Sequence, residues 1–425
     1  MILNQYCQLI KLMRSVINEM TKNSKKTTLL VLASTFPRWN DDTEPRFVYD
    51  LCLRLKEEYT LIVLAPHEKG AKNKEVIEGL QVYRYRYAPD FLEILAYEGG
   101  ISAKLKGNKL NYLILPFFFL GQWIAIIKLL KQYPIKAIHA HWLIPQGILA
   151  LVARLVSRNK PAILCTSHGG DLYGLNDPIS KTIKRYVIKN VDAMTVVSYA
   201  MQDEIKKFVP TAKQVVVAPM GTDLSNLFIP DDSVKRKPYQ LLFVGRLVEK
   251  KGLQYLLQAM PDIIKHYPET CLNIAGTGPE QALLEVLVKE LKLTKHVFFL
   301  GRLSHQALVN EYRQAAMAVF PFVQAKNGDV EGLGLVMIEA MGCGCPVIAS
   351  DIPAVRDVII DGKTGVLLES ANSKDIATKI LTLYTNTPAR KKLVTQARKF
   401  VVNNFDWNIS RNTYSDIIKR LSDNE

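Results

Sequence analysis

The sequence lacks a clear membrane-spanning segment and a cysteine framework. A long uncharged stretch, residues 111–127, covers only 17 residues and contains Pro116, Gly121 and Gln122, whereas a spanning helix needs about 20 apolar residues. The six cysteines are scattered without the spacing of a zinc site or a disulfide scaffold. Residues 1–20 carry charge where a signal peptide would be apolar, so we expect no signal peptide. These absences favour a cytoplasmic protein without a structural metal.

The composition is that of a folded chain with more than one core. Of the 425 residues, 48% are hydrophobic and 22% are charged, which is typical of soluble globular proteins. No repeat or low-complexity segment interrupts the sequence. A chain of this length exceeds one ordinary core, so we expect two domains.

The positive charge is concentrated in the first half. The net charge is +15; residues 1–220 hold 30 Lys and Arg against 18 Asp and Glu (+12), and residues 221–425 hold 25 against 22 (+3). A basic half is compatible with nucleic acid, anionic lipid headgroups, phosphorylated substrates or simply a solvated surface. Charge alone leaves these alternatives open.

Short β-branched runs alternate with helical patterns on both sides of a break at residues 230–238. This alternation predicts an α/β protein with two doubly wound, Rossmann-like domains of parallel strands that face each other across a cleft. We expect an N-terminal extension at 1–26, a first domain at 27–220, a second at 221–404, and a helix at 405–425 that crosses back to the first. Expected strands are 28–33, 60–65, 80–84, 137–140, 162–166, 193–197, 214–218, 240–244, 271–275, 297–300, 318–321 and 347–349.

Two motifs of the second half carry charged residues at expected strand or helix ends. Gly245 follows the strand 240–244, and Arg246 and Lys251 then stand at the edge of the sheet, where cations can clamp a diphosphate. Glu331 precedes an expected helix, and eight residues later Glu339 lies among apolar residues and needs hydrogen-bond donors.

A ribose diol would supply donors to Glu339, and the amides of residues 332–335 would suit a phosphate at the helix start. The alternative is an exposed Glu331 and a Glu339 that bonds a backbone amide.

These motifs, in this order, resemble the retaining glycosyltransferases of family 4, of GT-B architecture and of the bacterial exopolysaccharide or lipid-linked glycan type. The resemblance covers about residues 28–420. Its anchors are Gly-Arg-Leu-x3-Lys-Gly at 245–252, Gly-Thr-Gly-Pro at 276–279, Phe-Leu-Gly-Arg-Leu at 299–303, Glu-x7-Glu at 331–339 with the following Ala-Met-Gly-Cys-Gly-Cys-Pro, and Asp-Gly-Lys-Thr-Gly at 361–365.

The resemblance implies a donor that is a nucleotide-diphosphate sugar, with no further cofactor. Arg246 and Lys251 would bind the diphosphate and stabilise the leaving group, Glu331 would contact the sugar hydroxyls, and Glu339 would contact the ribose. The implied donor-binding set also includes Gly245, Arg302, Leu303, Gly332, Leu333, Gly334 and Leu335.

The first half offers a histidine motif and an unusual loop. His168 follows the strand 162–166, and the resemblance places it beside the transferred sugar. We expect His139 and His141 to point to opposite faces of their strand, to form cleft wall and packing, and not to share a metal. Many relatives have a Gly-Gly loop after the first strand, whereas residues 36–47 contain no glycine. This loop is expected to face the acceptor, and the acceptor-side residues are Arg38, Asp41, Asp42 and Asp171.

The leading hypothesis is a retaining, metal-independent hexosyltransferase of polysaccharide or glycolipid biosynthesis, because no Asp-x-Asp dyad stands at a strand end. Its acceptor would be a glycan or a lipid-linked hydroxyl. One alternative is a UDP-sugar 2-epimerase, which would need carboxylates such as Asp41, Asp42 and Glu44 around the sugar. A basic nucleic-acid-binding protein leaves the glutamate pair without a role, so we expect no nucleic-acid partner. Residues 112–127 form either a core helix or an apolar surface that docks peripherally on an anionic membrane.

Overall fold

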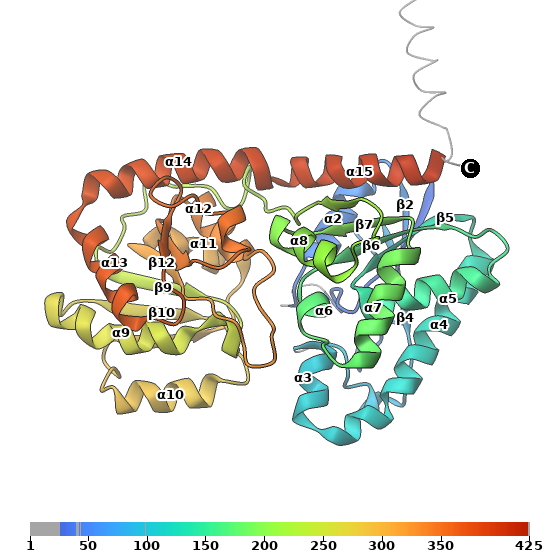
Figure 1. Cartoon of the computed structure of the whole chain (residues 1–425), viewed down its shortest axis with the longest axis horizontal. Coiled ribbons are helices and arrows are strands. Elements are labelled where there is room, and N and C mark those ends of the chain that lie inside the picture. Colours follow the sequence, from blue (N-terminus) through green and yellow to red (C-terminus); the bar gives the residue numbers. More distant parts are fainter. Residues whose placement is uncertain (1–25, 40–41, 43, 98, 424–425) are drawn as a thin grey trace, which may run out of the picture.

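The computed structural model describes residues 26–423 except residues 40, 41, 43 and 98. The expected extension 1–26 therefore lies almost wholly outside the described residues, and so does the candidate site residue Asp41. Two α/β domains lie side by side, with the N-terminal domain on the right of Figure 1 and the C-terminal domain on the left. The predicted fold class is confirmed by this arrangement.

The N-terminal domain is built on an eight-stranded sheet with the order β3-β4-β2-β1-β5-β6-β7-β8. Every pairing is parallel except the β3–β4 hairpin. The strands are β1 (Thr28–Leu32), β2 (Thr60–Pro66), β3 (Lys74–Ile77), β4 (Leu80–Tyr85), β5 (Ile135–His141), β6 (Ala162–Ser167), β7 (Ala193–Val196) and β8 (Val215–Val217).

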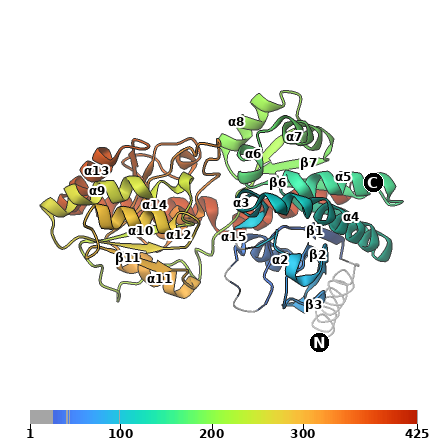
Figure 2. The same cartoon turned by 90° about the horizontal axis from the view of Figure 1, so that it is seen from below.

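Helices cover both faces of this sheet (Figures 1 and 2). They are α2 (Phe47–Leu55), α3 (Gly100–Gly107), α4 (Leu115–Gln132), α5 (Ile148–Val156), α6 (Gly170–Tyr173), α7 (Pro178–Asn190) and α8 (Tyr199–Phe208), with short turns η1 (Asp90–Leu92), η2 (Lys109–Leu113) and η3 (Leu143–Gly147). Because both faces are covered, β1 and β2 are almost continuously apolar.

The C-terminal domain has a six-stranded parallel sheet with the order β11-β10-β9-β12-β13-β14. Its strands are β9 (Gln240–Val244), β10 (Cys271–Ala275), β11 (Val297–Gly301), β12 (Met317–Phe320), β13 (Val347–Ser350) and β14 (Val366–Leu368). Its helices are α9 (Leu253–His266), α10 (Gln281–Glu290), α11 (His305–Gln314), α12 (Leu335–Gly342), α13 (Ser373–Thr385) and α14 (Thr387–Phe405), with the turns η4 (Glu249–Lys251) and η5 (Val355–Asp357).

Two strands of the structure have no counterpart in the sequence prediction, and one breaks its rule of parallel pairing. β3 is an edge strand whose side chains are exposed or half-buried, so it carries no apolar pattern that could reveal it. It pairs antiparallel with β4, which corrects the expectation of purely parallel sheets. β14 has only three residues, too few for a periodic signal.

The chain returns to the N-terminal domain through its last helix. α14 and α15 (Trp407–Asp423) follow each other along the top of Figure 1, across both domains. The Tyr414 hydroxyl is buried and donates to the Ala218 carbonyl at 2.9 Å, and the Tyr59 hydroxyl donates to the Ser415 carbonyl at 3.1 Å. These contacts attach α15 to the first domain.

Candidate active site

The C-terminal side of the candidate site begins where β9 ends. Gly245 has a φ of 156°, and a side chain there would approach the Lys251 methylenes. The turn at Gly276 and Gly278 packs so tightly on this segment that a Cβ at Gly276 would lie 2.0 Å from the Gly245 carbonyl oxygen. The motifs 245–252 and 276–279 therefore form one surface at the carboxyl edge of the sheet, where ligands of open α/β sheets bind.

Lys251 and Glu331 form an ion pair at this edge. The Lys251 ammonium lies 2.6 Å from the Glu331 carboxylate and 4.7 Å from the centre of the Phe322 ring. Burial on its own would raise the pKa of Glu331, but the positive charges of Lys251 and Lys250 outweigh it and lower this pKa to about 2. Glu331 is therefore ionised at neutral pH, and its ammonium partner is fixed beside it.

The pKa of Glu339 is shifted in the opposite direction from that of Glu331. The buried Tyr312 hydroxyl donates to Glu339 Oε2 at 3.1 Å, and burial raises the pKa of this carboxyl to about 7. The alternative of a backbone amide as its donor is not what the structure has, because the donor is a tyrosine side chain of α11. Further hydrogen-bond donors would stabilise the ionised form of this carboxyl.

Between the two glutamates the chain turns into α12. Gly334, with a φ of 85°, is the residue before the first helical residue, Leu335. Glu331 therefore precedes the helix, as predicted, with a three-residue loop between them. Gly332 and Leu333 precede it as a buried loop whose backbone is close to the first domain.

The two domains meet backbone to backbone at the site. A Cβ placed on Gly332 would lie 2.9 Å from the His168 carbonyl oxygen, and one on Gly169 would lie 3.1 Å from the Gly332 Cα. Only glycine allows this approach, which brings the segment after β6 against the segment after Glu331. The structure thus brings His168 next to the glutamate motif, whose first residue, Glu331, lies 163 residues later in the sequence.

His168 belongs to a neutral histidine cluster. His141 Nδ1 and His168 Nε2 are 3.0 Å apart, and His139 Nε2 bonds the Thr166 hydroxyl at 2.8 Å. Burial lowers the pKa of His168 to about 3 and that of His139 to about 3. These rings are therefore uncharged at neutral pH and contribute hydrogen bonds and shape rather than charge.

The prediction that His139 and His141 point to opposite faces is wrong. Residues two apart on a strand share a face, and the centres of the two rings lie 4.1 Å apart. The expected packing role fits, because both residues are buried, His139 lies 5.4 Å from the Tyr414 ring, and His168 stacks on His141 at 5.2 Å.

Asp171 is buried next to His168. Its carboxylate accepts hydrogen bonds from the Ser167 hydroxyl at 2.9 Å, from the Leu143 amide at 2.7 Å and from the His168 amide at 3.2 Å. These bonds engage both oxygens, and the residue is buried. Asp171 therefore positions the His168 backbone, and its place on the acceptor side stays a prediction.

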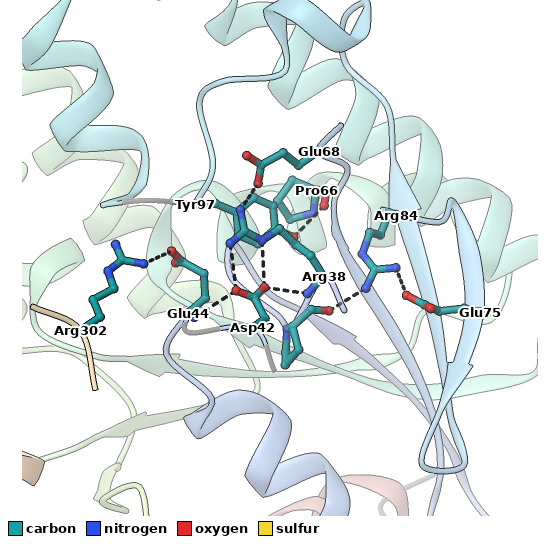
Figure 3. A network of polar contacts seen from close by, with 10 residues as sticks. Arg38, Asp42, Glu44, Pro66, Glu68, Glu75, Arg84, Tyr97 and Arg302 are labelled. Atoms are coloured by element: carbon teal, nitrogen blue, oxygen red, sulfur yellow. Dashed lines mark hydrogen bonds and ion pairs between the residues drawn. The ribbon is translucent and has the colours of Figure 1, made fainter. Parts of the chain in front are cut away.

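The glycine-free loop 36–47 is held by a buried charge network (Figure 3). Arg38 forms two bonds with the Asp42 carboxylate, at 2.8 and 2.9 Å, and a third with Glu68 at 2.5 Å. This guanidinium contributes to lowering the pKa of Asp42 against the effect of burial. Arg38 and Asp42 are therefore buried supports of the loop, and their place on the acceptor side stays a prediction.

Two contacts cross the cleft and involve donor-side arginines. Arg246 Nη1 donates to the Gly99 carbonyl at 2.8 Å. Arg302 lies 3.8 Å from the Glu44 carboxylate (Figure 3) and also donates to the Thr277 hydroxyl at 3.1 Å. Glu44 in turn donates its amide to Asp42 at 3.2 Å, so the loop network extends to the C-terminal domain.

Among the described residues, one group of side chains could hold a metal ion, and it belongs to the N-terminal domain. Ligand atoms of His67, Asp90 and Glu93 lie within 4.8 Å of one another. Both ring nitrogens of His67 already face protein oxygens, those of Glu93 and of the Ala71 carbonyl, so the group is complete as a hydrogen-bonded cluster.

Two family models match the chain in succession. Residues 45–226 match the model described as Glycosyltransferase Family 4, and residues 227–400 match the one described as Glycosyl transferases group 1. The chain belongs to the family 4 type of GT-B glycosyltransferases. The predicted family is thereby confirmed, and the boundary between the two models falls close to the predicted domain boundary.

Curated relatives of this glycosyltransferase act on different molecules according to their names. It is 27% identical to the GDP-mannose-dependent alpha-(1-6)-phosphatidylinositol monomannoside mannosyltransferase of Mycolicibacterium smegmatis, over 83% of this chain and 88% of the relative. It is also 27% identical to the N-acetyl-alpha-D-glucosaminyl L-malate synthase of Bacillus anthracis, over 63% and 70%.

Solved structures share the two-domain fold. A sucrose-phosphate synthase from Thermosynechococcus elongatus superposes with a TM-score of 0.77 at 22% identity, over 93% of this chain and 99% of that one. The Anabaena protein HepE in complex with UDP and glucose superposes with a TM-score of 0.70 at 16% identity, over 92% and 99%. At these identities the similarity shows the fold alone.

The sequence motifs did not reveal three residues that contact the site. Tyr312 gives Glu339 its hydroxyl donor, Lys250 binds Asp329 at 3.1 Å, and the Gly99 carbonyl receives Arg246. The position of Lys250 next to Lys251 is a signal for it, whereas Tyr312 and Gly99 come from distant elements that no local pattern indicates. Glu44, which faces Arg302, entered the sequence analysis only through the epimerase alternative.

Proposed function

We propose that this glycosyltransferase transfers a hexose from a nucleoside-diphosphate sugar to a hydroxyl of a glycan or lipid-linked acceptor in polysaccharide or glycolipid biosynthesis, with retention at the anomeric carbon. The donor side is the C-terminal domain. The named relatives support a nucleotide sugar as donor, since one uses GDP-mannose and one neighbour holds UDP and glucose.

The observation that carries the proposal is the Lys251–Glu331 pair beside Gly245. Lys251 is held at a sheet edge by a carboxylate that stays ionised, and its ammonium has further hydrogens for a diphosphate. To bind the same ligand, Arg246 would lose only its described hydrogen bond to the Gly99 carbonyl. Such preorganised cations stabilise the charge that develops on a leaving diphosphate.

The reaction we infer has one substitution at the anomeric carbon. The bond from this carbon to the diphosphate oxygen breaks, and the acceptor oxygen bonds to the same carbon from the same side. Lys251 and Arg246 neutralise the leaving diphosphate, while Glu331 accepts hydrogen bonds from sugar hydroxyls. His168 is too weak a base, with a pKa of about 3, to take the acceptor proton efficiently. We assign that proton to the leaving diphosphate.

Glu339 holds the nucleotide in this proposal. A ribose diol offers two hydroxyl donors, and the carboxyl of Glu339 has only the Tyr312 hydroxyl as its described donor. Arg302 and Leu303, which follow β11, would face the nucleobase, and Gly332, Leu333, Gly334 and Leu335 would approach the phosphates and sugar. The reaction proceeds without a metal ion, because the two cations fill that role, and it takes place on the cytoplasmic side.

A thermal-shift screen tests the donor assignment. The full chain is heated with UDP, GDP and ADP and with their common sugar conjugates, and a ligand that binds the folded state raises the melting temperature. We expect one base to stabilise the protein and the Lys251→Ala variant to lose much of that shift. The absence of any shift at millimolar nucleotide would overturn the proposal.

A further inference from the structure

One face of the N-terminal domain exposes large apolar side chains in a continuous segment. Leu110 and Leu113 of η2 are 68% and 71% exposed, and Phe117 of α4 is 60% exposed. The same segment also exposes Tyr112, Leu120 and Ile124. Folded proteins rarely show a patch of this kind unless it contacts a partner or a membrane.

The spacing aligns these side chains along one side of the helix. Leu113, Phe117, Leu120 and Ile124 are separated by four, three and four residues, so they form one stripe. The opposite stripe, Phe118, Gln122, Ile126 and Leu129, is buried against the domain. A surface helix normally has a polar outer side, whereas α4 is apolar on both.

This arrangement decides between the two alternatives for residues 112–127. The segment from Lys109 to Gln132 is long and apolar enough to cross a membrane, yet only 28% of its most apolar window is buried. It is therefore not a core helix buried on all sides. Its inner stripe packs in the domain and its outer stripe faces solvent.

The neighbouring elements extend the apolar area. α5 packs beside α4, and its last two residues, Leu155 and Val156, are 72% and 60% exposed. α4 and α5 lie side by side at the outer end of the N-terminal domain in both views, while α3 lies nearer the C-terminal domain (Figures 1 and 2). We call η2, the outer stripe of α4 and the end of α5 the α4 surface.

The charges within this segment of the sequence have one sign, although Arg154 of α5 pairs with Asp192 from outside the segment. Between Glu98 and Asp171 the sequence has nine Lys and Arg and not one Asp or Glu. Lys128 and Lys131 are exposed and continue the outer stripe of α4, and Lys109 is exposed at its start. Arg158 and Lys160 are exposed just beyond α5. Cations around an apolar face are complementary to an anionic lipid leaflet.

We propose that the α4 surface docks this enzyme on an anionic membrane as a monotopic protein, with the outer stripe of α4 in the headgroup boundary. A second copy of the chain is a poor occupant, because it would bring another predominantly basic surface against this one. Full insertion of α4 is also excluded by its contacts, since Gln122 and the whole inner stripe are packed in the domain.

Docking would bring the reaction close to the leaflet. Only α3 and one residue separate η2 from Gly99, whose carbonyl receives Arg246 across the cleft. A hydroxyl on a lipid-linked acceptor could therefore reach the site without leaving the membrane. This consequence rests on the proposed function, whereas docking itself does not.

Vesicle sedimentation tests the proposal. The full chain is mixed with vesicles of phosphatidylcholine alone or with phosphatidylglycerol added, at low and high salt. The protein is expected to sediment with the anionic vesicles at low salt and to be released by salt. Leu113→Glu/Phe117→Glu/Leu120→Glu changes only exposed or half-exposed positions and is expected to weaken vesicle binding by at least about tenfold.

A matched control uses apolar residues that are exposed elsewhere. Leu283 and Val286 of α10 are 69% and 50% exposed, and Leu283→Glu/Val286→Glu is expected to bind vesicles as the wild type does. Protein that stays in the supernatant on strongly anionic vesicles at low salt overturns the proposal. So does equal loss in both variants.

Two further outcomes would replace the proposal with another one. Membrane-bound protein that resists alkaline carbonate extraction would mean a spanning helix, and a solution dimer that the triple variant dissociates would mean that a second copy covers the α4 surface. The nucleotide-induced thermal shift of the triple variant is measured in parallel and should equal that of the wild type. Failure of nucleotide binding is thereby separated from failure of docking.

Discussion

The two sides of the cleft differ in how they use polar groups. On the C-terminal side, Lys251 and Glu331 are charged and paired, and burial raises the pKa of Glu339, eight residues later in the sequence, to about 7. On the N-terminal side, His139 of β5 and His168 after β6 are uncharged at neutral pH, and Arg38 is paired with Asp42 and Glu68. In the proposed reaction, the charges that act on the donor therefore come from one domain, while the other provides shape, hydrogen bonds and access for the acceptor.

The largest expected effect comes from the donor-side cations. We expect Lys251→Ala to lower kcat by about 10²–10³-fold, the loss typical of one preorganised group at developing charge. Arg246→Ala should lower kcat by about tenfold to a hundredfold. Lys250→Ala is the matched control, because this adjacent lysine binds Asp329 instead, and its loss should stay below about tenfold.

Steady-state turnover of the donor measures these losses, and circular dichroism with the melting temperature checks the fold. Near-normal turnover in Lys251→Ala would remove the diphosphate clamp and, with it, the contrast between the two sides.

The second prediction separates the two glutamates. Glu339→Gln should weaken binding of the free nucleoside diphosphate and of the sugar conjugate alike, by about tenfold to a hundredfold, because a charged hydrogen bond to ribose does not depend on the sugar. Glu331→Gln should weaken the sugar conjugate preferentially. Isothermal calorimetry with both ligands gives the four values, and equal losses in both variants would contradict the division of roles.

A third prediction concerns pH. The free protein holds a proton on Glu339 below a pKa of about 7, and the ribose diol favours the ionised form. Nucleotide binding should therefore release a proton below pH 7, and affinity should fall roughly fivefold to tenfold from pH 7.5 to pH 6. Calorimetry in buffers of different ionisation enthalpy detects the proton. Glu339→Gln should abolish the release, and an affinity that rises toward low pH would reverse the assignment.

The smallest expected effect is that of a chelator. EDTA should leave turnover within about twofold, since Lys251 and Arg246 supply the charge that a divalent ion would otherwise bring. Complete loss of turnover that Mg²⁺ or Mn²⁺ restores would show a metal ligand set that neither the sequence nor the cation pair explains.

The sequence predicted the C-terminal side better than the N-terminal side. β9 and β10 begin and end at the predicted residues, because each is a mainly apolar run that ends at a glycine, Gly245 or Gly276. Local motifs also brought Gly245, Lys251 and Glu331 to one sheet edge, since the topology of a parallel sheet places its strand ends together.

The rest depended on contacts that no local pattern encodes. The sequence shows Arg38 and Asp42 as loop charges without partners, whereas Glu68 and the ring of Tyr97 contact the guanidinium from other elements. His139 and His141 lie two residues apart on β5 and therefore share a face, opposite to the prediction. Tyr312 is an ordinary core tyrosine in sequence, and only the packing of α11 on α12 gives its hydroxyl a partner.

Proton NMR of the reaction tests the central claim most directly. The donor found in the thermal-shift screen is followed with and without an acceptor, and the anomeric coupling of the product reports its configuration. The account predicts a new glycoside with the anomeric configuration of the donor, formed only when acceptor is present. A donor epimerised at C2 without acceptor would instead identify an isomerase, and an inverted product would contradict retention.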